Sequence, residues 1–507
     1  PATHGHDPGC AGKAGAAVIP ISSVTLSNLC AVAPEIVLCI FGILTMLADP
    51  FLARGRKRLL GWFSFAGIIA GLAAVRFLSP GASVGATAYS GLIRVDHFSI
   101  FVHLIVIAAA GLVILGSMQY LDDEGIQRSE YYALVLFAAA GMGILAGANE
   151  LVTAFVGLEM SSISSYILAG FRRRAVKSNE SSLKYFILGS FATAFFLYGI
   201  AMVYGATGTT RIDMIQSALV QLPSLPALAL VGLGLIFVGL GFKVVAAPFQ
   251  IYAPDVYEGA PTPVTALLAS APKAATFALM LRIFYVSFSS AQHFWFWAIW
   301  VSAVLTMLIG NLGALVQNNV KRMLAYSSIS HAGYILVAFV ASTELGVAAV
   351  LFYLAAYVLM KVGAFLVVTH LGQQGEKRLD IKDYAGLGMK QPVLALCFSL
   401  FLLSLLGLPA TGGFLGKFFA FKAALDSRIV WLVVIAALNS VIGAYYYLRV
   451  IVAMYFWEPS KDYIPTKVAP ALSFALAVAA AGTLYLGIIP ARALDFARLA
   501  ANSLFLR

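Results

Sequence analysis

The 507-residue chain is too apolar to be an ordinary water-soluble protein. Hydrophobic residues make up 61% of it and charged residues only 11%, with a mean hydropathy of +0.91, whereas soluble domains carry about 25% charged residues. Its 33 Lys and Arg against 22 Asp and Glu give a net charge of +11, which in a soluble chain would suggest nucleic-acid binding. In a membrane protein this excess of positive charge lies in the loops between the spans. We therefore expect the lipid bilayer, and no nucleic acid, as a partner.

Apolar windows of 18 or more residues predict an all-α polytopic bundle of about fourteen transmembrane helices. The windows lie near residues 31–49, 60–79, 97–117, 130–148, 151–170, 183–204, 227–249, 262–286, 294–316, 323–341, 346–370, 391–421, 429–457 and 468–488. We expect 1–30 to be an N-terminal tail, 31–117 the first three helices, and 468–507 the last helix with its tail.

The basic residues predict the orientation. Alternate loops hold 17 Lys and Arg, and the opposite set holds five when both tails are left out. Cytoplasmic loops carry the excess of Lys and Arg. With an even number of spans, both termini are then expected outside the cytoplasm.

No redox or metal motif is present in the sequence. It contains no Gly-rich nucleotide loop, no haem-attachment CxxCH and no iron-sulfur cysteine set, and its four Cys have no metal spacing. We therefore expect no cofactor and no metal in this chain.

Ionisable residues inside the predicted spans are the unusual feature. Each costs about 2.5 to 3.5 kcal/mol at mid-bilayer on insertion scales, and a purely structural bundle needs none. They are Glu159, Lys184, Lys243, Lys273, His331, Lys361, Lys417 and Arg449. A purely structural role stays open for individual residues of this set. Lys184 can extend to the membrane interface, His331 can be a hydrogen-bonded core residue, and Arg449 can neutralise a neighbouring charge.

Helix breaks accompany two of the lysines. Pro248, Pro254, Pro261 and Pro263 follow Lys243 in PFQIYAPDVYEGAPTP, and Pro409, Gly412 and Gly413 precede Lys417 in LPATGGFLGK. Backbone groups freed by a break are tolerated in a membrane only where protein or water solvates them. A polar cavity is expected at both places, although a simple packing kink remains an alternative.

The same charges predict an internal repeat. Glu159 with His331, Lys184 with Lys361, Lys243 with Lys417, and Lys273 with Arg449 are separated by 172 to 177 residues. The repeat would pair five helices in 130–286 with five in 294–457, and an odd number of helices inverts the second copy. Inverted repeats with broken helices and a mid-membrane polar site are typical of secondary ion transporters.

The residue types favour protons as the transported ion. Na⁺ and Ca²⁺ need cages of oxygen ligands, whereas Lys and His supply exchangeable protons. Burial favours the neutral amine of Lys over the ammonium. We expect Glu159 and Lys184 to tune Lys243, and protons to pass along Lys243, Lys273, Lys361 or His331, and Lys417.

At these residues the chain resembles the antiporter-like membrane subunits of respiratory complex I and of Mrp-type sodium/proton antiporters. The stretch FKVVAAPFQIYAPDVYEGAPTPVTALLASAPKAATFAL is most similar to the subunit N family of bacterial NADH:quinone oxidoreductase, as are VDHFSIF, YYALVLFAAAGM, GLEMSSISSYILAGFRR and SSLKYFILGS. The resemblance covers about 90–457. It implies a proton-translocating subunit of an inner-membrane translocase, whose peripheral partners use NADH, FMN, iron-sulfur clusters and quinone.

By position, Glu159 matches the gate glutamate of this family, Lys243 and Lys273 match its central lysines, and Lys417 matches its exit-side lysine. Lys417 and the short segment after residue 488 favour the subunit N branch over its sisters. Two departures are Gln250, where the family has His, and Tyr252, where Trp is usual. A relay through that His is therefore in doubt.

Two other functions remain open at this point. The chain could serve an Mrp-type cation/proton antiporter or an ion-pumping membrane hydrogenase on the same scaffold. It could also be a passive assembly subunit whose buried charges only pair. Copurifying flavin and iron-sulfur subunits would separate the first alternative from complex I.

Overall fold

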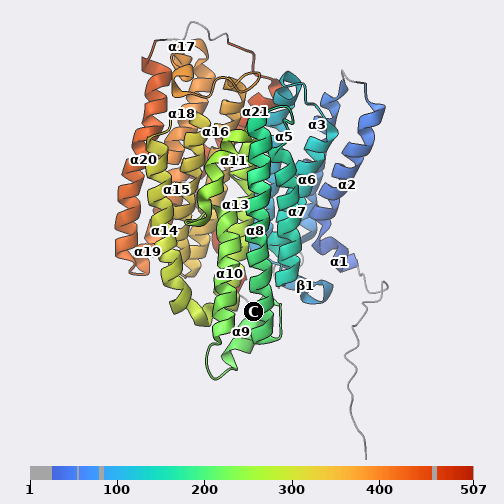
Figure 1. Cartoon of the computed structure of the whole chain (residues 1–507), viewed down its shortest axis with the longest axis vertical. Helices are drawn as coiled ribbons and strands as arrows, with labels where there is room; N and C mark the ends of the chain where they lie inside the picture. Colours follow the sequence, from blue (N-terminus) through green and yellow to red (C-terminus); the bar gives the residue numbers. More distant parts are fainter. Residues whose placement is uncertain (1–25, 54–55, 79–84, 459–464, 506–507) are drawn as a thin grey trace, which may run out of the picture.

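The computed structural model of the chain describes residues 26–53, 56–78, 85–458 and 465–505. Figure 1 shows long helices packed side by side along the long axis of the molecule. We call the end with α17 (Leu387–Lys390) the upper end. The lower end carries α9 (Ile212–Val220) and the short antiparallel hairpin of β1 (Ala86–Ala88) and β2 (Ile93–Val95).

The remaining helices form the bundle. The first half contains α1 (Leu26–Ala31), α2 (Ala33–Ala48), α3 (Arg58–Ala74), α5 (His97–Asp123), α6 (Ser129–Gly147), α7 (Leu151–Ala169), α8 (Val176–Thr207), α10 (Ala227–Val244), α11 (Ala253–Gly259), α12 (Thr262–Leu268) and α13 (Ala271–Leu281). The second half contains α14 (Gln292–Leu315), α15 (Val320–Val340), α16 (Glu344–Leu371), α18 (Pro392–Leu406), α19 (Gly412–Asp426), α20 (Val430–Phe456), α21 (Pro470–Ile488) and α22 (Ala491–Phe505).

The predicted polytopic helical bundle is confirmed. Within the described residues, thirteen helical stretches are long and apolar enough to span a membrane, and α18 is a shorter apolar helix. Together α18 and α19 account for the span expected at 391–421. The expected N-terminal tail is only partly described, because 1–25 lie outside the described residues; α1 occupies its end.

The C-terminal segment is more ordered than expected. Residues 491–505 were predicted as a tail, but they form the helix α22, which packs against α5 and α16. Its buried side chains include Leu494, Ala497, Ala501 and Leu504, spaced to make one apolar stripe. This stripe explains why a segment with several charges still docks on the bundle.

The most buried helices lie at the centre and carry Lys273, His331 and Lys361. Almost all side chains of α5, α13, α15 and α16 are buried, whereas α2, α8, α20 and α21 leave much of their apolar surface exposed. Helices that are apolar on every side can be buried in this way. The polar groups on the central helices therefore have only protein neighbours with which to pair.

Three spans are interrupted, two of them where the sequence suggested breaks. After α10, Val245 adopts a left-handed conformation with φ 58°, and the chain resumes through a short 3-10 helix, η6 (Phe249–Tyr252), into α11. A second break at Ala269 and Ser270 separates α12 from α13. The third follows α18, where Gly407 has φ 99°, a conformation that favours glycine.

A buried ion pair fixes the lower end. Asp96 caps α5 by accepting from the backbone N–H of Ser99 at 2.8 Å. The Arg282 guanidinium donates to both carboxylate oxygens of Asp96, at 2.7 and 2.9 Å, and the two side chains are 2% and 0% exposed. The pair joins α5 to η7 (Arg282–Ser287), the π-helical turn that continues α13.

A buried carboxylate, Glu376, ties four segments together at the upper end. It accepts from the Thr262 backbone N–H and hydroxyl at 2.7 Å each, from the Tyr120 hydroxyl at 2.8 Å, and from the Lys321 ammonium at 2.9 Å. The Arg172 guanidinium lies 3.6 Å away. Glu376 thus holds the start of α12 against α5 and α15.

Replacing Asp96 by Asn should strongly destabilise the protein. The amide leaves the buried Arg282 charge uncompensated, and breaking one side of a buried pair costs about 3 to 5 kcal/mol. Asp213→Asn is the matched control, because the Arg211–Asp213 pair is about one-third exposed and such pairs contribute about 1 kcal/mol or less. The unfolding temperature of the purified protein in detergent measures both; equal effects would contradict the assignment.

The Glu376 pairing should make stability depend on pH in acid. Burial acts to raise the pKa of Glu376, but Lys321, Thr262 and Arg172 outweigh it and hold the pKa below its ordinary value. The stabilisation is therefore present above the unfolded pKa of about 4.3 and is lost as pH falls through the lower folded value.

The test compares the unfolding temperature of the native protein with that of Glu376→Gln between neutral pH and pH about 3.5. We expect the native protein to be more stable by a constant margin above the ordinary glutamate pKa of about 4.3. That margin should shrink at lower pH. A margin that stays the same across this range would show that the carboxylate charge contributes nothing.

Candidate proton-transfer site

A row of buried basic side chains crosses the centre of the bundle. It consists of Lys243, Lys273, His331, Lys361 and Lys417, each at most 7% exposed. In the described part of the chain, none of them lies within 4.0 Å of a carboxylate oxygen. Their hydrogen-bond partners are hydroxyl and carbonyl oxygens. These neutral oxygens accept a hydrogen bond from the basic group without adding a negative charge that would hold it in its protonated form.

Lys243 lies at the end of α10, directly before the first break. Its ammonium is 3.3 Å from the Tyr166 hydroxyl and lies over the rings of Tyr166 and Tyr185, 4.9 and 5.2 Å from their centroids. Aromatic faces attract a cation through their quadrupoles. The left-handed turn at Val245 ends the helix here, so that Lys243 meets an aromatic lining rather than another helical turn.

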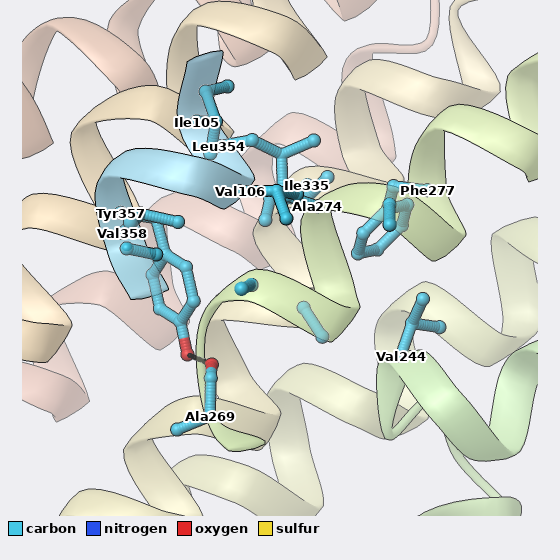
Figure 2. Close-up of a cluster of buried hydrophobic side chains, with 14 of the residues drawn as sticks. Ile105, Val106, Val244, Ala269, Ala274, Phe277, Ile335, Leu354, Tyr357 and Val358 are labelled. Carbon is cyan, nitrogen blue, oxygen red and sulfur yellow. Dashed lines mark hydrogen bonds between the residues drawn. The ribbon is translucent and has the colours of Figure 1, made fainter. Parts of the chain in front are cut away.

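Lys273 lies in the first turn of α13, after the second break. Its ammonium donates to the carbonyl of Ser328 at 2.6 Å and to the Ser328 hydroxyl. That hydroxyl is 2.8 Å from the Tyr357 hydroxyl, which donates to the freed carbonyl of Ala269. Figure 2 shows this last bond inside a cluster of apolar side chains that includes Phe277 and Leu354.

His331 and Lys361 belong to one hydroxyl-linked group on α15 and α16. The two ring nitrogens of His331 lie 2.9 Å from the Tyr353 hydroxyl and 3.2 Å from the Tyr447 hydroxyl. Tyr447 contacts the Ser327 hydroxyl, to which the Lys361 ammonium donates at 3.0 Å. A chain of hydroxyl groups therefore connects the His331 ring to the Lys361 ammonium.

Lys417 lies in α19, after the third break. Its ammonium donates to the carbonyl of Leu406 at 2.8 Å and to the Ser440 hydroxyl at 2.9 Å, and it lies 4.8 Å from the Tyr334 ring centroid. Leu406 ends α18. The helix break therefore supplies a carbonyl that an unbroken helix would have used internally.

Glu159 and Lys184 are not brought together. Glu159 is half-buried, and its Oε1 is buried without a hydrogen-bond partner among the described residues. Lys184 is 41% exposed and pairs with Glu180 at 2.7 Å and with Asp255 at 2.9 Å. Lys184 therefore lies at the periphery of the bundle.

The register of α7 against α8 explains this separation. The Ser182 hydroxyl donates to the carbonyl of Tyr166, and the Ser178 hydroxyl donates to that of Ala169. In this antiparallel pairing Lys184 lies near the level of Tyr166. Glu159 is therefore about two helical turns, or ~10 Å, farther along the helix pair at 1.5 Å per residue.

The two departures from the family pattern lie next to Lys243. Gln250 is buried, and its side-chain oxygen has no hydrogen-bond partner among the described residues. Tyr252 is buried, donates to the carbonyl of Phe242 at 3.1 Å, and stacks on Tyr185. Arg449, the proposed repeat partner of Lys273, instead caps the end of α14 by donating to the Gln317 carbonyl.

Several buried charged groups were missed from the sequence. They include Glu376 and a pair formed by Glu35 of α2 and His103 of α5, whose Oε1 and Nε2 are 2.6 Å apart. Asp255, which is 40% exposed, was missed as well. The sequence signal for the pair was the same as for the lysines, a single titratable residue inside an apolar run. Among the described residues, no group of three or more His, Cys, Asp or Glu side chains could hold a metal ion.

Comparison with known proteins identifies the family. Residues 148–443 match the family described as NADH:quinone oxidoreductase/Mrp antiporter, TM. The chain is 48% identical over 472 residues to NADH-quinone oxidoreductase subunit N 1 of Solibacter usitatus, covering 93% of this chain and 96% of that one. It is 46% identical over 477 residues to subunit N of Trichlorobacter lovleyi, covering 94% and 97%.

Solved structures agree on the fold. A chain of respiratory complex I from Thermus thermophilus is 34% identical, with a TM-score of 0.76 over 91% of this chain and 98% of that one. A chain of the Mrp complex from a Dietzia species superposes with a TM-score of 0.83 at 23% identity, over 95% and 98%. The latter likeness shows the fold alone. The resemblance stated from the motifs is confirmed: the chain belongs to the NADH-quinone oxidoreductase subunit N family.

Proposed function

We propose that this chain is the proton-translocating membrane subunit of an NADH:quinone oxidoreductase, and that its buried basic row is the proton path. One observation carries the proposal: four lysines are buried in the bundle without a carboxylate partner. A buried ammonium without a counter-charge is costly. Such a group releases its proton readily when a neighbouring acceptor becomes available, which a static structural role does not require.

The proposed route begins at Lys243, whose ammonium is stabilised by the charge of Glu159. Protons pass from Lys243 to Lys273, then to His331 or Lys361, and leave through Lys417. The hydroxyl groups of Ser327 and Tyr447 connect Lys361 to His331. Lys243 and Lys273 share no hydrogen bond in the described structure, so this transfer uses mobile water.

The second half of the proposal concerns symmetry. The five-helix units 130–286 and 294–457 are proposed to be inverted copies. The first unit has two broken spans, which carry Lys243 and Lys273, and the second has one, which carries Lys417. Lys243 precedes its break and Lys417 follows its break. If the second unit is inverted, one lysine opens toward each side of the membrane.

The assembly supplies what this chain lacks. NADH, FMN, iron-sulfur clusters and quinone are proposed to act in other membrane and peripheral subunits, and electron transfer there drives the proton movement here. The excess of Lys and Arg in the loops of the upper end supports a cytoplasmic upper end. Both termini would then lie on the outer, periplasmic side of a bacterial inner membrane.

Lys243→Met in the assembled complex should abolish coupled proton pumping and slow quinone reduction several-fold. The thioether fills the space of the lysine stem but holds no proton. Pumping is measured in proteoliposomes by the quenching of a pH-sensitive dye during NADH oxidation, and quinone reduction is measured in the same vesicles.

Lys422→Met is the control, because Lys422 is exposed on the helix that carries Lys417. This variant should pump normally. If Lys243→Met pumps protons and reduces quinone at the native rate, the relay assignment is wrong. Pumping that requires Na⁺ and persists without quinone reduction would instead favour the antiporter alternative.

A further inference from the structure

A cluster of charged side chains on the upper half of the bundle has no place in the relay described above. Lys184 of α8 pairs with Asp255 of α11, and the Arg322 guanidinium of α15 donates to the other oxygen of Asp255 at 2.9 Å. Arg322 also binds Glu258 at 2.8 Å. Asp255 therefore neutralises two cations that come from two other helices.

Two of the helices joined by Asp255 are directly connected to the relay. α11 continues the broken helix whose first part ends at Lys243, and α15 carries His331. Asp255 holds this second part of the broken helix against α8 and α15. Its position therefore decides how the segment around the break is held.

A small cavity opens beside this carboxylate. Its volume is 170 Å³, and its lining includes Lys184, Glu180, Asp255, Glu258 and Arg322. Such a volume has room for several waters, and each would find polar partners here. Asp255 is 40% exposed, so protons reach it from outside the bundle.

An aromatic layer lies beside Lys243. Tyr185 follows Lys184 on α8, and its ring lies 5.2 Å from the Lys243 ammonium. Tyr185 stacks on Tyr252 at 5.3 Å and 4°, and Tyr252 stacks on Phe242 at 4.0 Å. Lys184 lines the cavity, so the next residue of α8, Tyr185, links this layer of Tyr185, Tyr252 and Phe242 to one wall of the cavity.

We infer that Asp255 is a positioning residue at the uptake entrance for protons that load Lys243: it holds Lys184 and Arg322 around a hydrated cavity, behind the layer of Tyr185, Tyr252 and Phe242. The inference rests on the proposed relay through Lys243. A proton that reaches water in the cavity passes the aromatic layer when Tyr185 moves, and binds the Lys243 amine. Lys184 thus acts through Asp255, rather than through contact with Glu159.

The test is Asp255→Asn in the complete complex, reconstituted in proteoliposomes. The amide removes the charge that orients Lys184 and organises the cavity, so coupled turnover should fall several-fold. Formate, a small permeant weak acid, should restore most of the rate because it carries protons past a damaged entrance. Asp255→Glu, which keeps the charge, should retain most of the native rate.

A purely structural role predicts a different pattern: formate would restore nothing, and loss of turnover would follow loss of assembled complex. That pattern, or native turnover in Asp255→Asn, overturns the inference. If Asp255→Asn fails to assemble, Asp255→Asn with Lys184→Gln removes one negative and one positive charge together. It should assemble and show the same formate-dependent rate; absence of rescue in this assembled variant also overturns the inference.

Lys243→Met separates this inference from the relay itself. It should be inactive in pumping with or without formate, because the acceptor beyond the entrance is gone. If Lys243→Met pumps normally, the relay fails whatever Asp255 does. If Lys243→Met is inactive while Asp255→Asn is normal, the relay stands and the entrance lies elsewhere.

Discussion

The structure depends on how a positive charge is satisfied where, among the described residues, no carboxylate lies within ion-pair distance. Four lysines lie buried in the bundle, where the surrounding dielectric is low and an unpaired ammonium is costly. Carbonyl and hydroxyl oxygens satisfy them instead: Ser328 for Lys273, Leu324 and Ser327 for Lys361, and Leu406 and Ser440 for Lys417. Because neutral acceptors bind an ammonium without holding it as tightly as a carboxylate would, each lysine keeps a proton that it can release.

The broken helices follow from this requirement. In an intact helix most carbonyl oxygens already accept from the backbone N–H groups of the helix, and a break leaves additional carbonyl oxygens free to accept. The break after α18 leaves the Leu406 carbonyl for Lys417, and the break after α12 leaves the Ala269 carbonyl for Tyr357. The strong carboxylates are placed outside the row instead, where Asp96, Asp255 and Glu376 pair with fixed cations and hold helices together.

The sequence was sufficient for the spans and for the identity of the buried lysines, because both are local signals. Lys361 is a lone charge in a long apolar run, and its burial near the middle of α16 follows from that run. The pairings were not accessible in this way. Arg282 and Asp96 are separated by 186 residues, and nothing in the sequence around either residue indicates that the two form a pair.

The pairing of Lys184 shows most clearly which contacts could not be predicted from the sequence. Its position on the helix next to that of Glu159 suggested a common site, but adjacency of helices does not fix their relative height. Two serine hydroxyls on α8 set that height, and a shift by one helical turn would change every partner. Likewise, α22 was expected as a tail because it is short and charged. Its apolar stripe is recognisable only once the surface on which it docks is known.

That docking surface links the two distant parts of the chain in time as well as in space. The Ser503 hydroxyl accepts from the backbone N–H of Phe98, and the Ser503 carbonyl accepts from Arg94. The strand β2 and the lower end of α5 therefore gain these two hydrogen bonds to Ser503 only after α22 has been synthesised. A ribosome-bound chain can insert its helices one by one, but this corner of the fold closes only once α22 is available to dock.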